Sequence, residues 1–308
     1  MKDINIKSEK NVIRKKRIGA SIAYDVRSWL FVLPTILILI LVTYRPLFMG
    51  IWYSLHNMQG YTVKEWCGFK NYIEIFKDKL FLTALTNSIK YVIWSLAIGY
   101  FLPVLLAVLL NEAVRGKSIM RFFVYLPTIV PGMAAAMLWY MIYFPGDTGL
   151  LNIMLGKMGM PASQWLENPA LTIPLIVFSI TWGGAGSTTI YYLAALQGVN
   201  RELYEAGVID GMGILNRLKN IAFPQLYPVM LLFLVQQIMG VFQIMEQPLS
   251  MTGGGPNNAS LSLALLGYRY GFVYYKAGHG IAVGVIQFVM LMFMTLIYFK
   301  LEKKANEF

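Results

Sequence analysis

Six long apolar segments constrain this chain more than any other feature of its sequence. They lie near residues 29–50, 88–110, 122–144, 171–193, 225–247 and 281–300. A helix of about 20 apolar residues crosses the hydrocarbon core of a bilayer. A lone segment in lipid must satisfy its own backbone hydrogen bonds, which a helix does. The sequence therefore predicts an all-α integral membrane protein with six transmembrane helices.

The low content of charged residues agrees with a membrane location. Charged types make up 13% of the 308 residues, whereas about a quarter is usual for soluble domains. The single cysteine, Cys67, excludes an intrachain disulfide and a zinc site built on several cysteines. We interpret His56 and His279 as loop or interface residues rather than metal ligands, and we expect no metal or cofactor on this chain.

The distribution of basic residues predicts the topology. Eight of the 26 basic residues lie in the first 27 positions, and 17 of the 26 fall on one side when the loops alternate. Positive charge stays on the cytoplasmic side of a membrane. We therefore expect a basic cytoplasmic tail at 1–28, one transmembrane domain at 29–300 and a cytoplasmic tail at 301–308. Binding of nucleic acid is the other use of such charge, but its place before an apolar segment favours the membrane.

Two segments on the opposite side have their own patterns. Residues 61–76, YTVKEWCGFKNYIEIF, are expected to form an amphipathic helix along the outer surface, with aromatic side chains at the interface. Residues 251–260, MTGGGPNNAS, are expected to form a turn, because glycine frees the backbone and proline stops a helix.

The stretch EAGVIDGMGILNRLKNIAFP at 205–224 is unusual between two apolar segments. Ala206, Gly207 and Gly211 would give a short helix one face almost without side chains, which another surface could approach closely. Glu205 and Asp210 add charge around that face, and Pro224 suits the first turn of the next helix. Two interpretations stand side by side: a docking helix for a partner, or a glycine-rich linker that returns the chain to the membrane.

This stretch resembles the EAA loop of permease subunits in binding-protein-dependent ABC importers. That pattern has Glu-Ala-Ala, three residues, Gly, nine residues, Ile, one residue and Leu-Pro. The matching positions here are Glu205, Ala206, Gly207, Gly211, Ile221, Phe223 and Pro224. Gly207 stands in place of Ala and Phe223 in place of Leu. Segments 29–55, 121–139 and 249–260 are similar to parts of carbohydrate importer permeases, the type related to the longer maltose-system subunit and to glycerol-phosphate permeases.

The resemblance implies a type I ABC importer permease fold with both termini in the cytoplasm of a bacterial plasma membrane. It implies a coupling loop at 201–224, with Glu205, Ala206, Gly207, Asp210, Gly211, Ile221 and Pro224 meeting an ATP-hydrolysing subunit. The implied partners are a second permease, two ATP-binding subunits that hold ATP and Mg, a substrate-binding lipoprotein, membrane lipid and a carbohydrate, which we expect to be an oligosaccharide. No nucleic-acid partner is expected.

Polar and aromatic residues inside the spans are the candidates for a substrate path, because each is costly in lipid unless it faces a cavity or a partner. Amides hydrogen-bond to hydroxyls, and aromatic faces stack on sugar rings. The alternative interpretation is helix packing through small residues and amides. The candidates are Thr181, Trp182, Ser187, Gln236, Gln237, Gln243 and Glu246.

Two other classes of function are weighed against an importer permease. A self-sufficient secondary transporter or channel for a small polar solute favours charges within the spans, and only Arg45, Lys90 and Glu246 come near, all toward outer ends. A membrane enzyme needs a catalytic constellation, and neither HExxH nor Gly-x-Ser-x-Gly occurs. The GKS at 116–118 lacks the glycine that a phosphate loop needs at position 111, so ATP hydrolysis is expected on separate subunits.

Overall fold

The described part of the chain divides into two units. The structure is a computed structural model that describes residues 28–113, 115–198, 202, 206–207 and 209–305. Its contacts form two compact units, divided between Tyr53 and Ser54. The expected tails lie outside the described residues, except for residue 28 of the first and residues 301–305 of the second.

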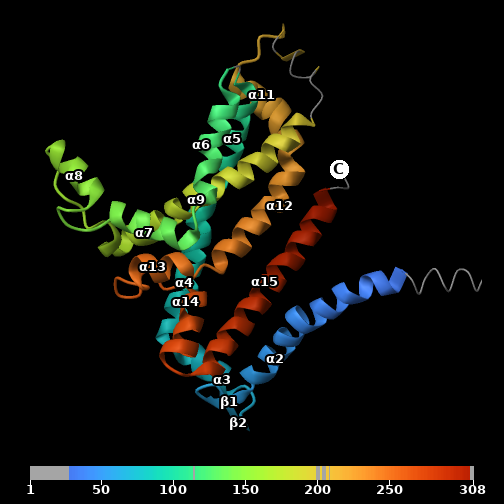
Figure 1. Ribbon diagram of the computed structural model, residues 1–308, viewed down its shortest axis with the longest axis vertical. Helices are drawn as coiled ribbons and strands as arrows, with labels where there is room; N and C mark the ends of the chain where they lie inside the picture. The colour runs from blue at the N-terminus through green and yellow to red at the C-terminus, as the bar shows by residue number, and fades with distance from the viewer. Residues whose placement is uncertain (1–27, 114, 199–201, 203–205, 208, 306–308) are drawn as a thin grey trace, which may run out of the picture. The chain divides into compact units, whose positions relative to one another are not determined.

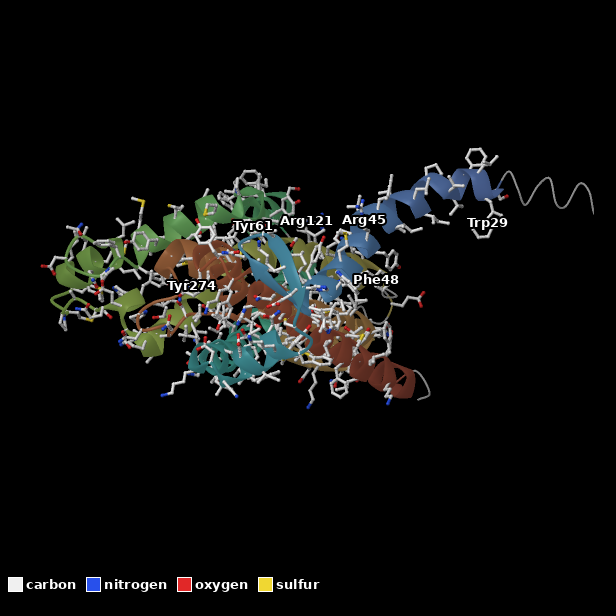
Figure 2. The ribbon with its side chains drawn as sticks, turned by 90° about the horizontal axis from the view of Figure 1, so that it is seen from below. Trp29, Arg45, Phe48, Tyr61, Arg121 and Tyr274 are labelled. Carbon is white, nitrogen blue, oxygen red and sulfur yellow. The ribbon has the colours of Figure 1, made fainter. Side chains whose placement is uncertain are left out.

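The first unit contains one helical run, Ser28–Ser54, which is long and apolar enough to cross a membrane. It includes a π-helical segment, η1 (Leu39–Tyr44), and continues as α2 (Arg45–Ser54). Large apolar side chains are exposed around it, and Figure 2 shows Trp29 and Phe48 at its surface. A helix that is apolar all round belongs in lipid or against other protein. The first predicted span is therefore confirmed as a helix of sufficient length.

The second unit begins with a hairpin that the sequence did not indicate. Strand β1 (His56–Gln59) pairs antiparallel with β2 (Thr62–Trp66), and a short helix, α3 (Lys70–Lys77), follows. The expected helix at 61–76 is therefore wrong in its first half, and the all-α prediction is wrong at this hairpin. β-Branched Thr62 and Val63 favour a strand, and Gly68, with φ +58°, separates the strand from the helix.

The later spans agree with the predicted segments but differ in length. The run Lys79–Glu112 consists of α4 (Lys79–Trp94), the π-helical η2 (Ser95–Gly99) and α5 (Phe101–Glu112). Helices α9 (Pro169–Gln197) and α15 (Ala277–Ala305) contain the fourth and sixth segments. Within the described residues, five helices pass a length and composition test for spanning a membrane, or six if one bent pair is counted as a span.

The bent pair replaces the straight helix expected at 122–144. Helix α6 (Lys117–Ile129) and helix α7 (Gly132–Ile142) meet at an angle of 98°. Pro131 lies at the break and has no amide hydrogen to donate, so it cannot continue the hydrogen-bond ladder of α6. Two short elements follow α7, namely α8 (Leu150–Lys157) and the 3-10 helix η3 (Trp165–Glu167).

The fifth predicted segment also ends early. The span there, Lys219–Phe242, begins in the π-helical η4 (Leu218–Ala222) and continues as α12 (Phe223–Phe242), and the short α11 (Ile214–Arg217) precedes it. The chain then turns, and Glu246 begins a separate short helix, α13 (Glu246–Thr252). The expectation that Glu246 lies within span five is therefore wrong. Side chains distant in sequence bind the carbonyls at this turn: Gln287 donates to the Phe242 oxygen at 2.8 Å and Ser262 to the Ile244 oxygen at 2.5 Å.

Helix α9 runs through the middle of the second unit, with α5 and α6 on one side and α12 on the other (Figure 1). Its contact with α6 depends on Gly186. A Cβ atom at this position would overlap the carbonyl oxygen of Val124 and lie 2.7 Å from Thr128 Oγ1 and 3.0 Å from Tyr125 Cα. The backbones of α6 and α9 can therefore approach closely only because residue 186 has no side chain.

The expected turn at 251–260 is confirmed. In sequence it connects the end of α13 to α14 (Leu263–Tyr268), and side chains of α4 bind to it. Gly253 and Gly254 have φ values of +59° and +93°, which glycine adopts without strain. Asn87 of α4 donates to the carbonyls of Asn258 at 2.8 Å and Leu261 at 3.1 Å. Tyr91 of α4 donates to the carbonyl of Ser260 at 3.0 Å. The π-helical η5 (Arg269–Val273) then leads toward α15.

Candidate functional sites: a central cavity and the 206–224 loop

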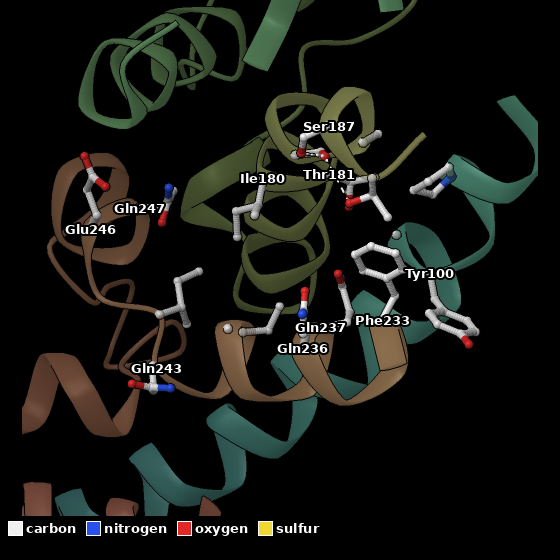
Figure 3. A pocket seen from close by; sticks show the side chains of 18 of the residues that line it. Tyr100, Ile180, Thr181, Ser187, Phe233, Gln236, Gln237, Gln243, Glu246 and Gln247 are labelled. Atoms are coloured by element: carbon white, nitrogen blue, oxygen red, sulfur yellow. Dashed lines mark hydrogen bonds between the residues drawn. The ribbon is translucent and has the colours of Figure 1, made fainter. Parts of the chain in front are cut away.

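A cavity of about 590 Å³ lies between α9, α12, α13 and the η2–α5 junction. Figure 3 shows that α9 and α12 form opposite sides of it. Its volume is within the range of small-molecule pockets, about 300–1,000 Å³. The side chains that matter for recognition are Tyr100, Thr181, Ser187, Thr188, Tyr192, Phe233, Gln236, Gln237, Gln243, Glu246 and Gln247.

One end of the cavity is formed where three elements approach at Gly99. A Cβ atom on Gly99 would lie 2.8 Å from Thr181 Oγ1 and 3.1 Å from Gln237 Nε2. The absence of a side chain at Gly99 thus leaves room for two polar groups from α9 and α12 (Figure 3). The Thr181 hydroxyl donates to the Val177 carbonyl at 2.9 Å, so its other hydrogen-bonding capacity is as an acceptor.

Two tyrosines contribute hydroxyls to the same region. The Tyr100 hydroxyl donates to the Met230 carbonyl at 2.7 Å and so joins α5 to α12. Tyr192 of α9 is fully buried, and among the described residues its hydroxyl has no hydrogen-bond partner. A buried hydroxyl without a partner is destabilising, and a ligand in the adjoining cavity is one means of satisfying it.

The other end of the cavity is formed by the turn after α12. Gln243 caps the C-terminus of α12, and its amide donates to the Met239 carbonyl at 3.1 Å. Glu246 and Gln247 extend from the start of α13 (Figure 3). The Glu246 carboxylate lies against the N-terminus of α7, since a Cβ on Gly132 would be 2.8 Å from Glu246 Oε2.

Most of the residues predicted for a substrate path lie together in this cavity. Thr181, Ser187, Gln236, Gln237, Gln243 and Glu246 all line it. Trp182 does not, because its ring packs edge-on against Trp139 at a centroid distance of 5.7 Å.

The prediction omitted five of the lining side chains named above, namely Tyr100, Thr188, Tyr192, Phe233 and Gln247. Thr188 follows a predicted residue directly, and Tyr100 follows a glycine in an aliphatic span. Polar and aromatic residues inside an apolar segment are thus the signal that could have found these two.

The chemistry of the cavity suits an uncharged ligand with many hydroxyl groups. Four glutamine amides, four hydroxyl-bearing side chains of α9 and three aromatic rings, those of Tyr100, Tyr192 and Phe233, are available. Of the described residues that line the cavity, none is Lys, Arg or His, and Glu246 supplies a carboxylate. An anion would find no counter-charge there, whereas amides and hydroxyls both donate and accept hydrogen bonds.

The second site is the loop before α12. Glu205 lies outside the described residues, but Ala206, Gly207 and Ile209 are helical. The helix ends at Gly211, which has φ +71°, and the Met212 amide donates to the Gly207 carbonyl at 2.8 Å. This is the Schellman arrangement, in which a left-handed glycine closes a helix. Gly211 therefore terminates the helix.

The expected bare face on this helix is wrong at Gly207. Gly207 is buried, and a Cβ on it would lie 3.2 Å from Ile221 Cδ1 and 3.4 Å from Met212 Sδ. Two positions of the motif thus pack against each other inside the loop. Ala206 and Asp210 are exposed and Ile209 is 86% exposed, so these residues form the outer side. Pro224 lies in the first turn of α12, as predicted.

Comparison with known proteins relates these sites to a family. Residues 99–307 match the family described as binding-protein-dependent transport system inner membrane component. A probable ABC transporter permease protein of Bacillus subtilis, YurN, is 29% identical over 284 residues, which cover 91% of this chain and 97% of YurN. The arabinooligosaccharides transport system permease protein AraP of Bacillus subtilis is 31% identical over 237 residues, 76% of this chain and 75% of AraP. The trehalose/maltose transport system permease protein MalF of Thermococcus litoralis is 28% identical over 276 residues, 89% of this chain and 93% of MalF.

A solved structure shows the same fold. A chain from the crystal structure of a bacterial ABC transporter involved in the import of the acidic polysaccharide alginate superimposes with a TM-score of 0.83 at 24% identity. The match covers 94% of this chain and 99% of that one. The sequence matches confirm the family that the loop motif predicted, and the solved structure confirms the fold. The chain is a multi-pass membrane protein of the binding-protein-dependent transport system inner membrane components, the permease subunits of ABC transporters.

Proposed function

We propose that this chain is one of two permease subunits of an ATP-driven importer whose substrate is an uncharged oligosaccharide. The observation that carries the proposal is the cavity between α9 and α12, which offers amides, hydroxyls and aromatic rings without a basic side chain. Relatives whose names refer to trehalose and maltose and to arabinooligosaccharides support the substrate class. Relatives named for sn-glycerol-3-phosphate transport also match. Among the described lining residues, however, the one charged side chain is Glu246, which would repel a phosphate ester.

The proposed topology has six spans with both termini in the cytoplasm of a bacterial plasma membrane. The bent α6–α7 pair supplies the third span, and the basic tail at 1–28 stays inside by the positive-inside rule. Residues 29–300 form the transport domain, with the coupling loop at 201–224. On this topology, the hairpin and the turn at 251–260 face the substrate-binding lipoprotein.

The proposed partners divide the work. Two ATP-binding subunits hold ATP and Mg and perform hydrolysis, and a second permease completes the path. The coupling loop presents Ala206, Ile209 and Asp210 to an ATP-binding subunit, and Glu205 precedes them in the sequence. Gly207 packs against Ile221 inside the loop, and Gly211 ends the helix that carries this surface.

The first test is gentle extraction of the tagged chain, with the co-purifying proteins identified by mass. A second permease and an ATP-binding subunit in a ratio of about 1:1:2 supports the proposal. A chain that purifies alone and still moves solute in vesicles refutes it, and makes a secondary transporter or channel the better explanation.

The second test uses variants of the complete transporter in proteoliposomes. We expect Gln243→Ala to lower uptake of a neutral oligosaccharide, because the amide lines the cavity. Gln197→Ala is the matched control, since Gln197 is exposed at the end of α9 and is not part of the cavity lining. Equal uptake by the two variants would assign Gln243 to helix packing.

The loop is tested separately. Glu205→Lys reverses the charge beside the proposed docking surface, and we expect it to abolish uptake while the chain remains in the membrane. Normal uptake by this variant would contradict docking through Glu205.

A further inference from the structure

Arg217 joins the loop to a helix that is distant in sequence. Its Nη1 donates to the Met212 carbonyl at 2.7 Å. Its Nη2 donates to Glu112 Oε2 at 2.5 Å, and its Nε donates to Glu112 Oε1 at 3.3 Å. One guanidinium therefore contacts two elements at the same time.

Each end of this connection is structurally defined. Met212 directly follows Gly211, and its amide closes the helix by bonding to Gly207. Glu112 is the last residue of α5. Figure 1 shows α11, which contains Arg217, beside the same end of α5. Arg217 thus connects the cap of the helix proposed to dock with the terminus of a membrane-spanning run.

The chemistry of arginine is suited to such a joint. Its five donors lie in one rigid plane, so two can hold a carboxylate while a third holds a carbonyl. The side chains of Arg217 and Glu112 are 13% and 19% exposed. Limited exposure reduces screening by water and salt, and loss of either partner would leave a charge poorly solvated. Lysine at position 217 would keep the charge but has a single nitrogen.

The far end of α5 reaches the cavity. The run Lys79–Glu112 is continuous, and Gly99, Tyr100 and Pro103 line the cavity at the η2–α5 junction. The Tyr100 hydroxyl also bonds to Met230 of α12. A displacement at Glu112 can therefore reach the cavity wall along a helix, which is a stiff element. This route is additional to the covalent one, which leads from the loop through η4 into α12.

We propose that Arg217 is a positioning residue that fixes the coupling loop to α5, so that movement of the loop on the ATP-binding subunits is transmitted to the wall of the cavity. The proposal rests on the proposed function for its driving force. The joint itself is a property of this chain alone. The two can therefore be tested separately.

The first experiment measures amide hydrogen exchange of the purified chain in lipid nanodiscs. We compare Arg217→Lys and Arg217→Gln with Lys219→Gln, which removes an exposed positive charge from the same loop. Exchange in residues 206–222 should become about tenfold faster in both Arg217 variants, because local opening depends on local contacts. It should stay at the wild-type rate in Lys219→Gln. Wild-type exchange in both Arg217 variants overturns the joint.

The second experiment measures transmission in the complete complex and needs no sugar. A cysteine replaces Ser187 in the cavity, in a chain where Cys67 is serine, and its maleimide labelling rate is measured with and without a non-hydrolysable ATP analogue. We expect the analogue to change the rate in the parent chain and in Lys219→Gln. Arg217→Lys should reduce that change to about a fifth or less, the factor that corresponds to loss of a coupling of roughly 1 kcal/mol. An undiminished change in Arg217→Lys overturns the transmission role.

A reciprocal variant separates loss of fold from loss of the joint. Arg217→Glu combined with Glu112→Arg restores the ion pair, and partial recovery of the ATP-dependent labelling relative to Arg217→Glu alone supports the joint. If both variants fold and the ATP-dependent labelling does not recover, the role of the ion pair is overturned. Failure of the wild-type chain to assemble with ATP-binding subunits refutes the proposed function, and the exchange experiment still decides on the joint.

Discussion

Replacement of Gly186 by alanine tests the close approach of α6 and α9. An added methyl group would overlap the carbonyl oxygen of Val124 and lie 3.0 Å from Tyr125 Cα. Both atoms belong to the backbone, so neither can move aside without a shift of α6. We therefore expect Gly186→Ala to destabilise the fold although alanine is the better helix former.

The magnitude follows from comparison with Gly183→Ala in the same helix. Both substitutions gain about 0.8–1 kcal/mol of helix propensity. A Cβ on Gly183 meets nothing within 4 Å, so only Gly186→Ala adds overpacking. Because a backbone yields poorly, we take the upper part of the usual range for overpacking, about 2–3 kcal/mol. That difference corresponds to roughly 4–12 °C in unfolding midpoint at about 2–4 °C per kcal/mol.

The assay is thermal unfolding of the purified chain in nanodiscs, followed by far-ultraviolet circular dichroism. A fixed scan rate is needed because irreversible unfolding makes the midpoint depend on the rate of heating. Gly183→Ala should unfold at or above the wild-type temperature and Gly186→Ala below it. Equal midpoints for the two variants would refute the argument that these helices meet through their backbones at residue 186.

Three further predictions concern the cavity, the turn at 251–260 and Tyr270. Gly99→Ala should lower uptake, because its methyl group would displace two polar side chains of the cavity, whereas Gly183→Ala, which meets nothing within 4 Å and is not part of the cavity lining, should not. Asn87→Ala should lower the stability of the fold by about 1–3 kcal/mol, because the carbonyls of Asn258 and Leu261 lose their buried donor. Burial and the hydrogen bond to Asp78 raise the pKa of Tyr270 above 10. Above about pH 10 the tyrosine of the unfolded chain therefore ionises first, and the stability of the fold should decrease as the pH rises. This decrease should be smaller in Tyr270→Phe.

The measurements for these predictions each have a contradicting result. Uptake is measured in proteoliposomes of the complete transporter, and equal uptake by Gly99→Ala and Gly183→Ala would contradict the first. Unfolding of Asn87→Ala is compared with Thr86→Ala, whose hydroxyl bonds only locally within α4, and equal stabilities would contradict the second. Identical alkaline unfolding of wild type and Tyr270→Phe would contradict the third.

The spans were predictable because length and apolarity in lipid are local properties of a segment. The hairpin at 56–66 was missed because its aromatic and charged residues also fit one side of a helix, and only Gly60 and Gly68 signal the breaks. The end of α12 was missed for another reason. Gln287 and Ser262 satisfy the carbonyls of the turn from far along the chain, so no pattern near Phe242 announces it.

The candidate sites were predictable to a similar degree. Polar residues in an apolar run indicated six cavity residues, because their cost in lipid is a local argument. Trp182 was misleading, since a tryptophan suits sugar stacking as well as it suits the ring of Trp139. The inward packing of Gly207 on Ile221 could not be predicted, because it depends on how the loop folds back on itself.

The π-helical η2 sets the rotation of α5 relative to α4 within the long run Lys79–Glu112. An α-helix advances by about 100° per residue, so the extra residue of a π-turn rotates everything that follows by about that angle. The side of α4 from which Asn87 contacts the Asn258 carbonyl is therefore rotated relative to the regular helical continuation that would lead to α5. This rotation sets the direction in which Glu112 points toward Arg217. Deletion of one residue between Ser95 and Gly99 would leave a regular helix of ample length and unchanged apolarity. It would nonetheless turn Glu112 away from the loop, so the chain tolerates substitution in this segment better than a change of length.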